Sequence, residues 1–171
     1  MNLFGKFTKN NSELKKRAEM LLPSTKIAGI SVYTSLLKKF PAFESISVKD
    51  WDFFFPIASV FIATVGMEKT KISSKHKSEL SKIYGDSLNK WSSDWNKAFK
   101  DCSEFFWRTA EGLQSSNDPV YSQSPQYRIS DSIGSWLVWN LLGHPPETDD
   151  ERKLVRVVGN LVSEEFINWW A

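Results

Sequence analysis

The chain has 171 residues, enough for one domain with a sizeable hydrophobic core. Hydrophobic residues make up 41% of it and charged residues 25%, which excludes an intrinsically disordered chain and a typical integral membrane protein. The net charge of +2 hides an asymmetry. Residues 1–100 carry 17 Lys/Arg and 9 Asp/Glu, a net of +8, whereas residues 101–171 carry 5 and 11, a net of −6. The asymmetry could steer a charged partner, although the simpler interpretation is that the two halves attract each other within the fold.

Several features indicate a cytoplasmic protein without a membrane span. The first residues contain no apolar stretch followed by a cleavage site, so no secretory signal is expected. Cys102 is the single cysteine and cannot form an internal disulfide. The uncharged run from Phe53 to Met67 contains a proline and is shorter than the roughly 20 residues that a membrane-spanning helix needs. This run therefore predicts a buried core helix.

The first half of the chain predicts helices that begin or end at punctuating residues. Residues 1–11 are expected to be flexible, and prolines are expected to end the next two helices, Ser12–Leu22 and Ser24–Phe40. A third helix, Asp50–Gly66, is apolar on all sides and should be central, with Pro56 in its first turn or at a kink. Residues 68–84 are lysine-rich and should form a surface helix, or a loop followed by a helix, that ends near Gly85.

The second half begins with the clearest periodic pattern of the chain. From Asp86 to Leu113, apolar residues recur on one helical face and oppositely charged pairs recur on the other, which predicts one long helix. Residues 114–129 are expected to form a long loop. A short apolar helix over 132–142 should end at Gly143. Thr148 or Asp149 should begin a last helix that runs to about Trp170, with acidic residues in its first turn.

No segment shows the alternation that is typical of a strand. The eight tryptophans and twelve phenylalanines lie mostly at helical spacing. The sequence therefore predicts an all-α fold, a single domain over residues 1–171 that forms a bundle of six to seven helices with an aromatic-rich core.

The residues that could carry chemistry do not form a convergent set. Cys102 lies in the middle of the predicted apolar stripe, where a core thiol is expected rather than a nucleophile. His76 and Glu79 could share a metal ion, but two ligands surrounded by lysines make no closed site. Lysines outnumber arginines 17 to 5, so specific nucleic-acid binding is not expected. We therefore predict no catalytic residue, no metal site and no cofactor.

The end of the last predicted helix is the best candidate for a contact surface. Phe166, Ile167 and Trp170 lie on more than one face of it, and clustered exposed aromatics mark interfaces. Another helix or the long loop could instead cover these residues within the fold. The expected function is protein–protein interaction by a non-catalytic cytoplasmic protein, such as a regulator or an immunity or antitoxin-type protein. The C-terminal helix could also form a homodimer.

Two alternatives remain open at this stage. The first is a helical bundle that binds a small apolar or amphipathic ligand in an aromatic pocket. Its candidate lining residues are Trp91, Trp95, Trp136 and Trp139, with Asn140 or Glu165 orienting the ligand. Glu165 is included because it falls inside the predicted buried stripe of the last helix. The second alternative is an enzyme using carboxylates of the C-terminal half, which are Asp149, Asp150, Glu164 and Glu165.

Overall fold

A computed structural model describes the backbone of residues 3–171 and the side chains of residues 11–171. The chain is 83% helical and this part of it contains no strand, so the predicted all-α fold is confirmed. A single 3-10 turn, η1 (Pro41–Ser45), separates the first two helices. The helices are α1 (Leu3–Lys39), α2 (Val48–Glu68), α3 (Ser74–Trp91), α4 (Trp95–Gln114), α5 (Pro119–Gln123), α6 (Pro125–Leu142) and α7 (Asp149–Phe166).

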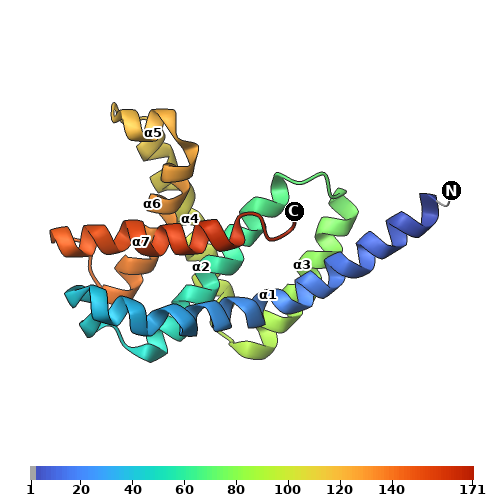
Figure 1. The fold of residues 1–171 in the computed structure, drawn as a ribbon, viewed down its shortest axis with the longest axis horizontal. Helices are drawn as coiled ribbons and strands as arrows, with labels where there is room; N and C mark the ends of the chain where they lie inside the picture. Colours follow the sequence, from blue (N-terminus) through green and yellow to red (C-terminus); the bar gives the residue numbers. More distant parts are fainter. Residues whose placement is uncertain (1–2) are drawn as a thin grey trace.

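The apolar helix α2 lies at the centre, and α1, α4, α6 and α7 all pack against it (Figure 1). It is long and apolar enough to cross a membrane, but 72% of its most apolar window is buried inside the fold. The burial agrees with the predicted core helix. Pro56 lies in the helix interior rather than in the first turn. Because proline has no N–H group, the carbonyl oxygen four residues earlier, that of Asp52, receives no helical hydrogen bond. Asp52 is exposed, so water can bond to this oxygen.

Helix α1 is continuous where two shorter helices were predicted. Pro23 lies inside it. The carbonyl oxygen that Pro23 leaves without a hydrogen-bond donor belongs to Glu19, which is exposed, so water can bond to it and the helix continues. The helix starts at Leu3, so residues 3–11 are helical where a flexible segment was predicted, and residues 1–2 lie outside the described part of the chain. The inner face of α1 buries Ala18, Leu21 and Leu36.

The prediction of one long helix over residues 86–113 is wrong, because the helix is interrupted between Trp91 and Trp95. Ser92 is extended, and its hydroxyl accepts a hydrogen bond from the backbone N–H of Asp94 at 3.2 Å, an alternative to helical bonding. The break lets α3 pack against α1 while α4 packs against α2 and α6. Gly85, predicted to end the preceding helix, lies inside α3.

The long loop predicted over residues 114–129 is largely helical. Asp118 caps α5, with its carboxylate accepting from the backbone N–H of Val120 at 2.9 Å. Pro119 and Pro125 occupy the first positions of α5 and α6, where the missing N–H costs nothing. The prolines of this segment therefore start helices instead of marking a loop.

Helices α6 and α7 cross at very short range. A Cβ added to Gly134 would lie 2.1 Å from the carbonyl oxygen of Val155, and one added to Gly159 would lie 1.9 Å from that of Ser130. Ser130 and Ser163 share a hydrogen bond of 2.8 Å at the same crossing. The connection between the two helices is as predicted: Gly143 ends α6 with φ +78°, and Thr148 caps α7.

Candidate functional site

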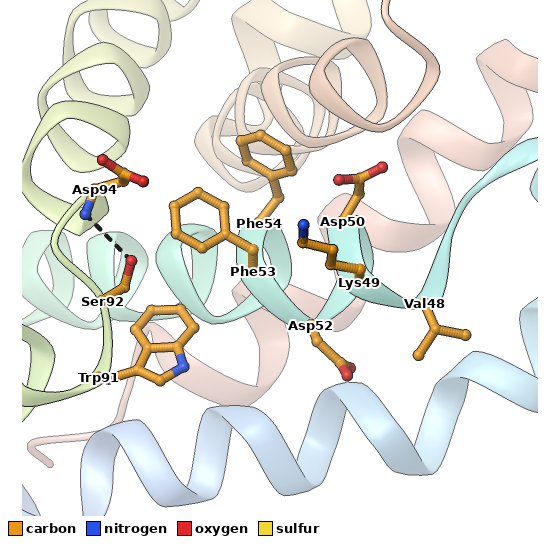
Figure 2. A pocket seen from close by; sticks show the side chains of 9 residues that line it. All are labelled: Val48, Lys49, Asp50, Asp52, Phe53, Phe54, Trp91, Ser92 and Asp94. Atoms are coloured by element: carbon orange, nitrogen blue, oxygen red, sulfur yellow. Dashed lines mark hydrogen bonds between the residues drawn. The ribbon is translucent and has the colours of Figure 1, made fainter.

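An open groove of about 810 Å³ lies between the first half of α2 and the α3–α4 turn, and we call it the α2–α3 groove (Figure 2). Its floor consists of aromatic side chains and its rim mainly of charged ones. The floor residues are Phe53, Phe54 and Trp91, and the rim residues are Val48, Lys49, Asp50, Asp52, Ser92 and Asp94.

The floor is built from two helices. Phe53 and Phe54 are neighbours on α2, with ring centroids 5.1 Å apart and planes at 79°. Trp91, the last residue of α3, faces Phe53 at 5.6 Å with an angle of 30° between the planes. All three side chains are half-buried, so part of each ring is accessible from solvent. The end of α3 at Trp91 contributes to this floor, because it places the indole ring beside Phe53 of α2.

The rim carries three carboxylates and one ammonium group, a net charge of −2. Asp50 is already occupied: it accepts a hydrogen bond of 2.6 Å from the hydroxyl of Ser47, the residue that caps α2. Asp94 is the residue before α4, but its carboxylate accepts no capping hydrogen bond from that helix. Figure 2 shows the three carboxylates around the aromatic floor rather than within it.

A cation already lies on one of these rings. The ammonium nitrogen of Lys26, on α1, is 5.8 Å from the centroid of Trp91. An aromatic face attracts a cation through its quadrupole, and tryptophan does so most strongly. Rings bordered by carboxylates form a surface suited to ammonium or guanidinium groups.

A contact through the buried ring of Trp136 links this groove to a second one. Phe54 makes an edge-to-face contact with Trp136, with centroids 5.8 Å apart. Trp136 lines a groove of about 660 Å³ between α4 and α6, which we call the α4–α6 groove. There the indole N–H of Trp136 donates to Asp101 at 2.8 Å. The remaining lining residues are Phe105, Arg108, Thr109, Trp139 and Asn140.

The predicted ligand-pocket residues do not all meet. Trp136, Trp139 and Asn140 line the α4–α6 groove, whereas Trp91 lines the α2–α3 groove. Trp95 lines neither; its ring contacts Phe99, and its indole N–H donates to Asn89 at 2.7 Å.

The predicted burial of Glu165 is wrong, because its side chain is exposed. Near its end, α7 buries Val162, Ser163 and Phe166, and Glu165 points away from that face. It lines a separate pocket of about 410 Å³ between α1, α2 and α7, and it lines neither aromatic groove.

The predicted contact surface at the C-terminus also needs correction. Phe166 and Trp170 are buried, and the indole N–H of Trp170 donates to the carbonyl oxygen of Ala63 at 2.9 Å. Both belong to the core, so they are not free to bind a partner or form a homodimer. The prediction assumed a helix up to Trp170, but α7 ends at Phe166 and the chain turns back onto α2. Ile167 is half-buried and, with Trp170, lines another groove of about 800 Å³.

Sequence reasoning missed a polar cluster that joins α5, α6 and α7. Asp131 is buried, accepts two hydrogen bonds from the guanidinium of Arg156, and accepts a third from the Tyr121 hydroxyl at 2.7 Å. Burial raises the pKa of Tyr121, and its hydrogen bond to Asp131 raises it further. The signal available in the sequence was an acidic residue directly before the apolar run of residues 132–142. Its bonds hold helices together.

Other titratable groups also have structural roles. Hydrogen bonds from the backbone N–H groups of Thr148 and Glu147 lower the pKa of Glu151, which completes the capping box of α7. Burial raises the pKa of the Cys102 thiol well above its ordinary value, and the predicted core position of this cysteine is confirmed. Over the described residues, no three His, Cys, Asp or Glu side chains are grouped as a metal site would require.

Comparison with known proteins gives no functional information: no family model, no curated protein and no solved structure matches this chain.

Proposed function

We propose that this is a non-catalytic cytoplasmic binding protein that holds a protein partner in the α2–α3 groove through a basic side chain of that partner. The observation that carries the proposal is the half-exposed aromatic floor, Phe53, Phe54 and Trp91, beneath a rim of net charge −2. Lys26 on the Trp91 ring is an intramolecular example of the same contact.

The magnitudes favour a protein over a free amine as the partner. An exposed cation–π contact contributes about 0.5–1 kcal/mol, and roughly 2 when it is desolvated. An exposed ion pair adds about 0–1 kcal/mol. Such a sum gives weak binding, so further contact area is needed. Further aromatic surface for a larger partner is present in the α4–α6 groove, where Trp139 is 42% exposed.

Peptide binding tests this proposal. Short peptides that present arginine or lysine should bind the native protein, and the same peptides with citrulline or acetyl-lysine should not. The double variant Asp52→Asn/Asp94→Asn should weaken binding several-fold, because it removes two rim charges. Asp86→Asn is the matched control, since Asp86 is exposed on α3 outside the groove. Equal binding of charged and neutral peptides would refute the proposal.

A small apolar or amphipathic ligand is the second candidate, and the α4–α6 groove favours it. Three residues predicted for such a pocket, Trp136, Trp139 and Asn140, line this groove together. A ligand there should change the fluorescence of Trp139 when lipid extract is added. Trp139→Ala should abolish the change, whereas Trp107→Ala should not, because Trp107 is exposed on α4 outside the groove.

The geometry gives less support to an enzyme based on the C-terminal carboxylates. Asp149 and Asp150 begin α7, while Glu164 and Glu165 lie 15 residues further along it. At 1.5 Å per residue the two pairs are about 22 Å apart, too far to share a cleft. Asp150 is also engaged, accepting a hydrogen bond from the backbone N–H of Ala42 at 2.9 Å.

A further inference from the structure

Helix α1 has a second apolar face, opposite the one that packs in the core. Its inner face buries Ala18, Leu21 and Leu36. The opposite face carries residues 20, 23, 27, 30, 34 and 37, which recur every three or four positions, and we call them the outer stripe. Its apolar side chains are exposed: Met20 51%, Ile27 65%, Ile30 64% and Leu37 38%. Its other members are Pro23 and Thr34, both exposed.

The outer stripe is extended and continuous. From Met20 to Leu37 it covers 17 residue steps, or about 25 Å of helix. Because Met20, Ile27 and Ile30 are each at least half exposed, this face is not enclosed between helices. Scattered exposed apolar side chains are ordinary on protein surfaces, but a stripe along one helical face has the form of a contact surface.

The charges around the stripe are mainly positive. Residues 20–39 contain Lys26, Lys38 and Lys39 and no aspartate or glutamate. Lys15 and Lys16 are exposed one turn before Met20, next to the exposed Glu19, and the exposed Glu165 of α7 lines a pocket together with Ile27. Over the described side chains, the one ion pair of α1 lies within the helix itself, between Arg17 and Glu13. Among the described side chains, none of these lysines is in an ion pair, and Lys26 lies over the Trp91 ring, so the cations left for a partner are those of Lys15, Lys16, Lys38 and Lys39.

We infer that the outer face of α1 is a peripheral docking surface for an anionic lipid bilayer. A helix with an apolar stripe flanked by lysines lies in the interface, with its apolar side chains among the acyl chains and its ammonium groups at the headgroups. Each lysine near an anionic surface increases partitioning by about fivefold. A second copy fits less well, because self-pairing would bring one lysine-flanked stripe against another.

Vesicle co-sedimentation of the full chain tests the inference. The protein should bind vesicles of phosphatidylcholine and phosphatidylglycerol in equal parts, and should not bind phosphatidylcholine alone. Raising the salt concentration should release it. Ile27→Asn/Ile30→Asn should lower partitioning by at least about tenfold, because two apolar side chains no longer insert. Val120→Asn, at an exposed position on α5, is the matched control.

Charge variants complete the design. Lys38→Gln/Lys39→Gln should weaken vesicle binding, and Lys97→Gln/Lys100→Gln on α4 should not. Equal binding to vesicles with and without phosphatidylglycerol, or unchanged vesicle binding by Ile27→Asn/Ile30→Asn, would overturn the inference. Self-association without vesicle binding, lost in that same variant, would assign the stripe to a second copy. Because Asp52→Asn/Asp94→Asn should leave vesicle binding intact, failure here is separable from failure of the proposed groove function.

Discussion

Two glycines set the distance between α6 and α7. Gly134 and Gly159 face each other where the helices cross, and neither leaves room for a Cβ atom beside the opposing backbone carbonyl. A backbone carbonyl cannot move aside as a flexible side chain can. Any larger residue at either position must therefore push the two helices apart.

Gly159→Ala should lower the free energy of unfolding by about 1–3 kcal/mol, because overpacking displaces one helix from the other. Gly85→Ala is the control, since nothing lies within 4 Å of a Cβ added there and alanine favours the helix. It should stabilise the protein by roughly 0.5–1 kcal/mol. Urea denaturation measures both variants, and unchanged stability of Gly159→Ala would show that the crossing is not tight.

At the scale of elements, the start of α7 contains a pH-sensitive cap. Thr148 and Glu151 form a reciprocal capping box, and the Glu151 carboxylate also accepts a hydrogen bond of 2.7 Å from the backbone N–H of Glu147. These bonds require the ionised carboxylate, which is why the pKa of Glu151 lies below its ordinary value of 4.5. His144, whose Nε2 lies 3.8 Å from a Glu151 oxygen, adds a further contribution in the same direction.

Stability from this cap should be fully present above pH 4.5 and should be lost as the pH falls through the lower folded-state pKa. Glu151→Gln should therefore lower the Tm at neutral pH, and the difference from the native protein should shrink on acidification. Melting curves across this range check the prediction. Lys153→Gln, at an exposed site on the same helix, is a suitable control. A difference that stays constant with pH would contradict the assigned role.

The sequence predicted most helices but missed several of their boundaries, for physical reasons. Pro23 and Pro56 were expected to end or bend helices, yet the carbonyl each leaves unpaired belongs to an exposed residue. The apolar periodicity also continues across Ser92–Asp94, although the helix is interrupted there. The interruption allows α3 and α4 to pack against different helices. Periodicity reports which residues turn inward, whereas such breaks depend on tertiary packing.

The candidate site was predicted in part. Trp136, Trp139 and Asn140 share one groove because they are close neighbours on a single helix, which spacing can reveal. The α2–α3 groove was not predicted, since Phe53 and Phe54 sit in a helix that is apolar on all sides and were assigned to the core. The packing of α3 against α1 places its last residue, Trp91, beside Phe53, where both α2 rings are half-exposed.

At the scale of the whole molecule, the uneven charge is not cancelled by ion pairs between the two halves. Over the described side chains, the one ion pair between them is Lys100–Glu104, one turn apart in α4. Both proposed surfaces lie in the basic half of the chain, because the lysines of α1 and the three rim carboxylates of the α2–α3 groove all belong to residues 1–100. The rim is therefore a local acidic patch that suits basic side chains, whereas α1 suits an anionic bilayer.

The central claim is that a cation from a partner binds on the aromatic floor of the α2–α3 groove. Its most direct test is the indole N–H resonance of Trp91, assigned by its absence in Trp91→Phe and followed by NMR during titration with a short arginine peptide. This resonance should shift progressively, and the citrulline version of the peptide should leave it unmoved. Equal shifts with both peptides, or an arginine titration that moves other indoles but not Trp91, would contradict the account.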